Sequence, residues 1–371
     1  MNDNVKNLLR FFSVLVIVSS CSKDDLRSYP SGQTQPYPVS DPIQDSTPVY
    51  TPYYDYDNII PGAVTVGHLS EPSVDLASAV CNDRFYYATY DHMDIFDPLT
   101  NSLSRKDFQF DRTSMAAASC GRKVMFAGGM LYNPTNLSVT AKSKVDIYNT
   151  DTGEWMAADL SVARYGVITI THNNKVFFAG GSVDVYTASD RIDIYDASSN
   201  SWSTAQLSAK CRPVITVVGK KLWFAIPGTD KIDIYDPDSN TWTTQTVPTI
   251  IAGTLAVSLE SKVFFTGSRD INVYDTASNS WSVLTLSERK FLIPVGVSND
   301  KIAFIGGMTS WFVYSTTIEI YDPFTNKWTI SGMKADLYYS AIISHDNYIY
   351  IAGGFINQEN NMLDRIYRFS L

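Results

Sequence analysis

The sequence predicts an all-β fold made of repeated four-stranded units. The first observation is a recurring stretch, such as "IDIYDASSNSW" from Ile192, in which apolar and polar residues alternate before a turn and a Trp. The second observation is an apolar strand before each copy, such as "KVFFAGG" at Lys175–Gly181. The units are about 40 to 50 residues long and show no helical periodicity, which is typical of a β-propeller.

The first 20 residues are predicted to be a targeting segment. They combine Lys6 and Arg10 with the apolar run Phe11–Val18, which is too short to span a bilayer stably. Small residues then precede Cys21, an arrangement that resembles a bacterial lipoprotein signal. A plain secretory signal or a membrane-anchor helix is the alternative. The resemblance implies lipidation of Cys21 and an extracytoplasmic protein that contacts the membrane, by expectation the outer membrane, only through its lipid anchor.

Residues 21–60 are predicted to be a flexible tether, because they are rich in Pro, Ser and Tyr and have no hydrophobic periodicity. Within them, Ser22–Asp25 resembles a surface-export tag of some lipoproteins, which would place the protein on the cell surface rather than in the periplasm. Residues 61–371 carry the repeats and are predicted to form one propeller domain. The net charge of −9 argues against nucleic-acid binding through bulk charge.

Each unit is predicted to contain four strands, which we call a to d in chain order. Strand a is rich in small and β-branched residues, strand b ends near glycine, strand c carries a Tyr-Asp pair, and strand d begins at the Trp. The tyrosine position is occupied in turn by Phe96, Tyr148, Tyr195, Tyr235, Tyr274 and Tyr321.

The motifs of these units resemble those of the Kelch repeat family. The matching features are the diglycine after strand b, the Tyr-Asp pair, and a Trp seven residues after the Tyr. The resemblance covers Pro61–Leu371. The diglycine is intact at Gly128, Gly180, Gly306 and Gly353 with the glycine that follows each, and it is lost in three other units.

The strand count predicts seven blades, with six as the alternative. Seven a, b and c strands are recognisable, but only six d strands follow their own blade, because the chain stops soon after Phe369. The missing d strand is predicted to be Ala63–Pro72, in which Leu69 aligns with Leu160 and places Val64 at the Trp position. Pairing this strand into the last blade would close the ring and remove the exposed strand edges.

The repeated motif is predicted to be structural. In "IDIYDASSNSW", Asn200 stands where the turn needs a left-handed residue, and Trp202 is expected to fill the seam between neighbouring blades. A catalytic group is needed once rather than six times around a ring. The cysteines and the four histidines show no metal-ligand spacing, and Cys81, Cys120 and Cys211 do not form a disulfide framework. We therefore expect no cofactor or metal, and no catalytic constellation is recognisable.

The connections between strands b and c offer the stronger clue to binding, because binding residues on rigid scaffolds concentrate on loops. These connections have 15, 10, 10 and 11 residues in blades 2, 3, 6 and 7, but only 2 to 4 residues in blades 1, 4 and 5. The long connections would form two ridges flanking a groove. Their aromatic residues are the candidate contacts, unless they pack only against their own loops: Tyr132, Tyr186, Trp311, Phe312, Tyr314 and Phe355.

The d–a connections lie on the same face and carry arginines near the start of strand a. These could receive a carboxylate or another anion through forked hydrogen bonds. Arginine is common at this position in Kelch repeats, so a structural role that bridges blades is the alternative. The four residues are Arg112, Arg164, Arg212 and Arg289.

Together these features predict a lipid-anchored Kelch-type propeller that binds a protein or a glycan on the face of the b–c and d–a connections. Two alternatives remain. The resemblance to secreted Kelch propellers allows a carbohydrate-active protein such as a sialic-acid mutarotase or epimerase, which would need an acid, a base and an anion clamp. The chain could also be a scaffold in a cell-surface complex, since fold alone does not determine function.

Overall fold

The computed structural model describes residues 56–371 except 109–110, 134, 252, 254, 292, 311–312 and 357–360. The predicted signal segment, Cys21 and almost all of the tether lie outside the described residues. A short 3-10 helix, η2 (Tyr56–Asn58), precedes the first strand. In this part of the chain there is no helix long and apolar enough to cross a membrane.

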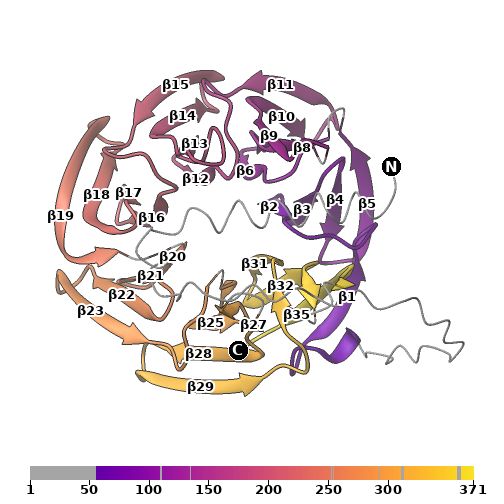
Figure 1. Cartoon of the computed structure of the whole chain (residues 1–371), viewed down its shortest axis with the longest axis vertical. Helices are drawn as coiled ribbons and strands as arrows, with labels where there is room; N and C mark the ends of the chain where they lie inside the picture. Colours follow the sequence, from indigo (N-terminus) through magenta and orange to yellow (C-terminus); the bar gives the residue numbers. More distant parts are fainter. Residues whose placement is uncertain are drawn as a thin grey trace, which may run out of the picture.

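The described residues form seven four-stranded antiparallel sheets arranged in a ring (Figure 1). Blade 1 contains β2 (Ala77–Cys81), β3 (Arg84–Ala88), β4 (His92–Asp97) and β5 (Ser102–Asp107). Blade 2 contains β6 (Ala116–Cys120), β7 (Lys123–Ala127), β10 (Lys144–Asn149) and β11 (Trp155–Asp159). Blade 3 contains β12 (Ile168–His172), β13 (Lys175–Ala179), β14 (Arg191–Asp196) and β15 (Ser201–Gln206). Blade 4 contains β16 (Val214–Val218), β17 (Lys221–Ala225), β18 (Thr229–Asp236) and β19 (Thr241–Ile251). Blade 5 contains β20 (Leu255–Leu259), β21 (Lys262–Thr266), β22 (Asp270–Asp275) and β23 (Ser280–Thr285). Blade 6 contains β24 (Val295–Ser298), β25 (Lys301–Ile305), β28 (Thr317–Asp322) and β29 (Lys327–Gly332).

Blade 7 contains β31 (Ala341–His345), β32 (Tyr348–Ala352) and β35 (Arg365–Phe369), and its outer strand is the N-terminal β1 (Val64–His68). The predicted closure of the ring by the first strand is therefore confirmed. Val64, which the alignment places at the Trp position, lies opposite Arg368, because a bulge between Thr65 and Gly67 shifts the pairing by one residue.

The seams between blades hold most of the core. Trp202 packs against Tyr195 at a ring-centroid distance of 5.1 Å and stacks on Phe178 at 5.7 Å. These three side chains belong to a cluster that also contains Ala118 and Met125 of blade 2. The aromatic residues of one blade thus cover the apolar face of its neighbour, which explains why the motif recurs.

The turn between strands c and d is fixed by its own side chains. Asn200 adopts φ 52°, as predicted, and its Oδ1 accepts a hydrogen bond from the Tyr195 hydroxyl at 2.8 Å. Asp196 Oδ1 accepts hydrogen bonds from the backbone N–H groups of Ser198 and Ser199. The Tyr, Asp and Asn of the motif are therefore occupied in building the turn.

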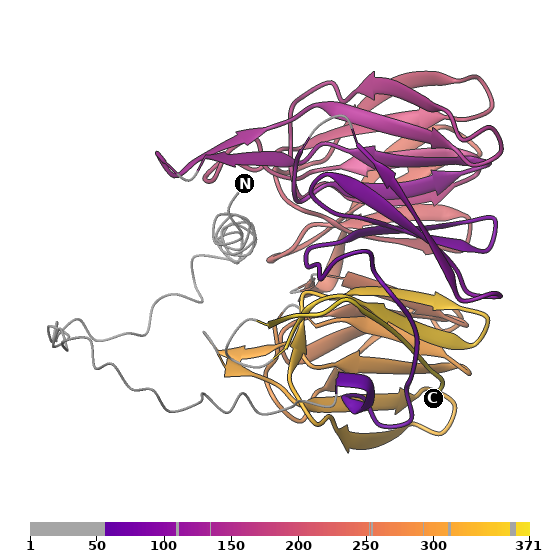
Figure 2. The ribbon, with the colours of Figure 1, turned by 90° about the vertical axis from the view of Figure 1, so that its right-hand side faces the viewer.

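Three of the long b–c connections fold into hairpins or small sheets. They are β8 (Met130–Asn133) with β9 (Ser138–Ala141), β26 (Met308–Ser310) with β27 (Val313–Tyr314), and β33 (Phe355–Ile356) with β34 (Asn361–Met362) and β30 (Leu337–Tyr338). Figure 2 shows β8–β9 and β26–β27 projecting from the same side of the ring. We call this side, which carries the b–c and d–a connections, the top face.

The glycine pairs explain how these connections begin. Gly180 and Gly181 have φ values of 62° and 89°, in the region that strongly favours glycine. A Cβ atom on Gly180 would also collide with the Cys211 carbonyl oxygen of the next d–a connection. The diglycine therefore permits both the unusual turn and the close approach of the neighbouring blade.

Candidate functional site

The predicted aromatic contacts lie in different environments. Tyr132 and Phe355 are buried, and Tyr314 stacks on Tyr338 at 3.7 Å between ring centroids. Tyr314 and Phe355 both pack against Tyr338, which lies in the d–a connection between blades 6 and 7 rather than in their own loops. Tyr186 is 96% exposed. The predicted contacts Trp311 and Phe312 lie outside the described residues.

Arg112 and Arg164, two of the predicted anion contacts, are engaged in ion pairs within the fold. Both side chains are almost fully buried. Arg164 forms an ion pair with Asp193 and donates hydrogen bonds to the Gly180 and Arg191 carbonyl oxygens at 2.7 and 2.6 Å. Arg112 pairs with Asp146 at 2.5 Å in the same way. Each arginine comes from a d–a connection and holds the c strand of the blade that follows.

In blade 6 a lysine takes this position, and the predicted Arg289 lies beside it. Arg289 lies over the Phe291 ring at 4.7 Å, whereas the neighbouring Lys290 is fully buried and pairs with Glu319 at 3.1 Å. The signal was present in the sequence. Lys290 follows Leu286 by four residues, just as Arg164 follows Leu160.

Arg212 belongs to a different set of residues, which surrounds the inner end of the top face. Each member stands two residues before the first paired residue of strand a of its blade. The a strands are the innermost strands and encircle the axis of the ring (Figure 1). We call this set the axial ring, and its residues are Asp75, Ser114, Gly166, Arg212 and Tyr339. They come from five blades and are brought together only when the ring closes.

Hydrogen bonds connect the axial ring from blade to blade. Asp75 Oδ2 accepts from the Ser114 backbone N–H at 3.1 Å and from the Ser114 hydroxyl at 2.8 Å. The Gly166 N–H donates to the Ser114 carbonyl oxygen at 3.0 Å, and Arg212 Nε donates to the Gly166 carbonyl oxygen at 2.8 Å. The acid and the guanidinium are therefore held in defined positions by the backbone between them.

The backbone of the axial ring is unusual. Asp75, Ser114, Gly166 and Tyr339 have φ values between 53° and 58°, and a left-handed conformation costs a residue with a side chain about 1–2 kcal/mol. Such strain in a residue as large as Tyr339 is uncommon and is concentrated at functional sites. Gly166 has a further reason to be glycine, since a Cβ atom there would collide with the Arg212 guanidinium.

Burial governs the electrostatics of Asp75. Desolvation raises the pKa of its carboxyl above the ordinary value of 3.8, although the bonds from Ser114 and the charge of Arg212 act in the opposite direction. A carboxyl group with a raised pKa close to a guanidinium combines a proton donor or acceptor with an anion-binding group. This combination is what acid–base chemistry on an anionic ligand requires.

Replacing Asp75 with Asn is expected to stabilise the fold at neutral pH. Above its raised folded-state pKa, Asp75 carries a desolvated charge that the unfolded chain does not have to bury, so the charge opposes folding. Below pH 3.8 the carboxyl is protonated in both states and the penalty disappears. Urea unfolding at pH 7 and at pH 3 should therefore show a gain for Asp75→Asn at pH 7 only. An equal gain at both pH values, or a loss at pH 7, would contradict this account of Asp75.

No protein-family model and no curated protein matches the chain. The solved structures do include a similar one, titled "Structure of YjhT", with a TM-score of 0.54, over 81% of this chain and 95% of that chain. The identity is 17%, so this similarity concerns the fold alone. The diglycines, the Tyr-Asp pairs and the seam Trp residues of the sequence agree with that fold. The chain therefore has a Kelch-like β-propeller fold.

Proposed function

We propose that the chain is an extracytoplasmic, lipid-anchored propeller that binds a carboxylate-bearing sugar at the axial ring. The observation that carries the proposal is the fixed placement of Asp75 and Arg212 in one hydrogen-bonded ring. A guanidinium binds carboxylates through forked hydrogen bonds, and a carboxyl group can hydrogen-bond to sugar hydroxyls. Lipidation of Cys21 and the tether of residues 21–60 would hold this site away from the membrane.

The surroundings of the axial ring fit a sugar better than a protein. Tyr339 lies against Tyr338 and Phe355, with ring centroids 5.7 and 6.4 Å apart, beside the stacked Tyr314. Aromatic rings beside a few placed polar groups are typical of small-ligand sites. In contrast, Tyr132 and Phe355 are buried and unavailable to a protein partner, whereas Tyr186 is exposed.

A second candidate is catalysis of sugar ring opening and closing, as in the mutarotase alternative that the sequence allows. The raised pKa of the Asp75 carboxyl favours it, because a general acid or base works best when its pKa approaches the ambient pH. Arg212 would then act as the anion clamp. The two candidates share one site and differ in whether Asp75 transfers a proton.

Replacing Arg212 with Met is expected to weaken binding of acidic sugars at least tenfold, since hydrogen bonds to charged groups contribute about 1.5–3 kcal/mol. Calorimetric titration would compare glucuronate and N-acetylneuraminate with neutral glucose and N-acetylglucosamine, using a chain with Cys21 replaced by Ser. Arg289→Met is the matched control, because Arg289 lies outside the axial ring and should leave affinity unchanged.

The outcomes separate the candidates. If no acidic sugar binds the unaltered chain, or if Arg212→Met binds as well as Arg289→Met, the axial-ring proposal is wrong. Where binding occurs, exchange between anomers measured by NMR tests catalysis. If the chain is an enzyme, Asp75→Asn should slow anomer exchange. If the chain only binds the sugar, anomer exchange should stay at its uncatalysed rate with or without the substitution.

A further inference from the structure

The cation that holds the c strand in blades 2, 3 and 6 is missing from blade 1. In blades 2, 3 and 6 the acid of strand c is paired with an Arg or Lys from the preceding d–a connection: Asp146 with Arg112, Asp193 with Arg164, and Glu319 with Lys290. The corresponding acid of blade 1 is Asp94, which is 2% exposed. Its connection, Ser70–Leu76, contains no Lys or Arg and carries two further acids, Glu71 and Asp75.

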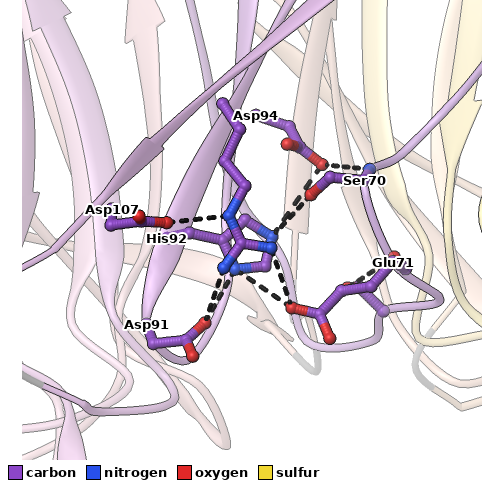
Figure 3. A network of polar contacts seen from close by, with 8 residues as sticks. Ser70, Glu71, Asp91, His92, Asp94 and Asp107 are labelled. Atoms are coloured by element: carbon purple, nitrogen blue, oxygen red, sulfur yellow. Dashed lines mark hydrogen bonds and ion pairs between the residues drawn. The ribbon is translucent and has the colours of Figure 1, made fainter.

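A buried histidine occupies the space instead. His92 is 1% exposed, and its Nε2 lies 3.0 Å from Ser70 Oγ and 3.9 Å from Asp94 Oδ2. Its Nδ1 lies 2.7 Å from Asp91 Oδ1 and 3.2 Å from Glu71 Oε1. Figure 3 shows Asp91 and Glu71 on one side of the imidazole and Ser70 and Asp94 on the other.

Negative charge exceeds positive charge around this imidazole. Glu71, Asp91 and Asp94 surround it, and the guanidinium nearby is that of Arg105. Arg105 is only loosely engaged, at 3.4 Å from Glu71 and 3.9 Å from Asp91, and its closest carboxylate is that of Asp107 at 2.7 Å. Asp94 Oδ1 is buried and has no hydrogen-bond partner among the described residues. A second cation would balance this cluster.

We propose that Glu71, Asp91 and His92 bind a divalent transition-metal ion such as Zn²⁺, Mn²⁺ or Co²⁺. One ligand atom from each residue converges within 4.8 Å of the others. An imidazole nitrogen with two carboxylate oxygens suits these ions, whereas Ca²⁺ and Mg²⁺ prefer oxygen ligands throughout. A hydrogen bond from His92 Nε2 to the Ser70 hydroxyl leaves the Nδ1 lone pair directed at the metal, as the outer partner of a metal-bound histidine commonly does.

The metal would also fasten the ring. Glu71 lies in the connection that follows the closing strand β1, whereas His92 begins β4 of blade 1 and Asp91 immediately precedes it. A metal bound by all three would cross-link the N-terminal closure to the first blade, where blades 2, 3 and 6 use an internal ion pair. Binding to the folded state would raise the thermal midpoint in proportion to the logarithm of the metal concentration.

The test uses the purified chain without a histidine tag, titrated with Zn²⁺ by calorimetry and with Co²⁺ by visible absorption. We expect one equivalent of Co²⁺ to give ligand-field bands, and EDTA to lower the thermal midpoint. Asp91→Asn and Glu71→Gln should each weaken binding at least tenfold, because each removes a charged ligand atom. His68→Gln is the matched control, since His68 pairs with Asp364 at 3.1 Å on β1 outside the cluster.

Replacing Arg105 gives the sharper result. Arg105 competes for the same carboxylates, so Arg105→Gln should bind the metal more tightly than the unaltered chain. The proposal is overturned if neither the unaltered chain nor Arg105→Gln binds Zn²⁺ or Co²⁺ at millimolar concentration. It is also overturned if His68→Gln weakens binding as much as Asp91→Asn, or if Arg105→Gln weakens it.

Discussion

Replacing Arg164 with Met is expected to lower the free energy of unfolding by about 3–5 kcal/mol, the range for breaking a buried ion pair from one side. Arg164 is fully buried, and its partner Asp193 is 2% exposed. Without the guanidinium, the Asp193 charge and the carbonyl oxygens of Gly180 and Arg191 lose their buried donors. Urea unfolding followed by Trp fluorescence would measure the change.

Two comparisons test the cause. Arg122→Met removes an ion pair with Asp151 that is mostly exposed, and it should change stability little. Adding Asp193→Asn to Arg164→Met removes the uncompensated charge. It also keeps an acceptor for the Ser161 N–H, which in the unaltered chain donates a hydrogen bond to Asp193 Oδ1 at 2.9 Å. The double variant should recover part of the loss. If Arg164→Met is as stable as Arg122→Met, the guanidinium does not hold the c strand of blade 3 in place.

Gly180→Ala is expected to destabilise the propeller by about 3 kcal/mol, from left-handed strain together with overpacking of a filled site. Gly180 has φ 62°, and an added Cβ would meet the Cys211 carbonyl oxygen and lie 2.6 Å from Pro213 Cδ. Both atoms belong to the d–a connection of the next blade. Accommodating the methyl group would therefore separate neighbouring blades.

Gly219 provides the control for this prediction. It has the same φ of 62°, but a Cβ atom there would meet nothing within 4 Å. Gly219→Ala should cost only the strain of about 1–2 kcal/mol. Denaturant midpoints of the two variants would separate the effect of conformation from that of close approach. Equal losses would mean that conformation alone explains why these positions are glycine.

The blade pattern could be predicted from the sequence because its causes are local. Alternation in "IDIY" defines the two faces of strand c, and Asn200 closes the following turn whatever surrounds it. The Trp202 position follows from the same spacing. Even the closure by β1 was predictable, since one d strand was missing from the count. Its register was not, because the bulge after Thr65 has no signature in the spacing.

The roles of the arginines depend on how deeply each side chain is buried, and the spacing of residues in the sequence does not indicate burial. Arg112 and Arg164 are buried against acids of strand c. Arg212 instead reaches the axial ring. Its d–a connection, counted from the leucine at the end of strand d to the start of strand a, is one residue shorter than that of Arg164. The sequence had grouped them as equivalent. Arg112 and Arg164 each fasten a d–a connection to the c strand of the blade that follows it.

The sequence by itself determined the all-β repeat, the four-strand unit and the seam-filling Trp, because each depends on residues close in the chain. It determined the closing strand through the count of d strands, although that strand pairs with residues at the far end of the chain. Only the tertiary structure placed Asp75 beside Arg212, or Glu71 beside Asp91 and His92. These residues are separated by connections and belong to different blades or to the closure between them. Their identities are unconstrained by the repeat, and the rigid packing of one blade against the next decides which of them meet.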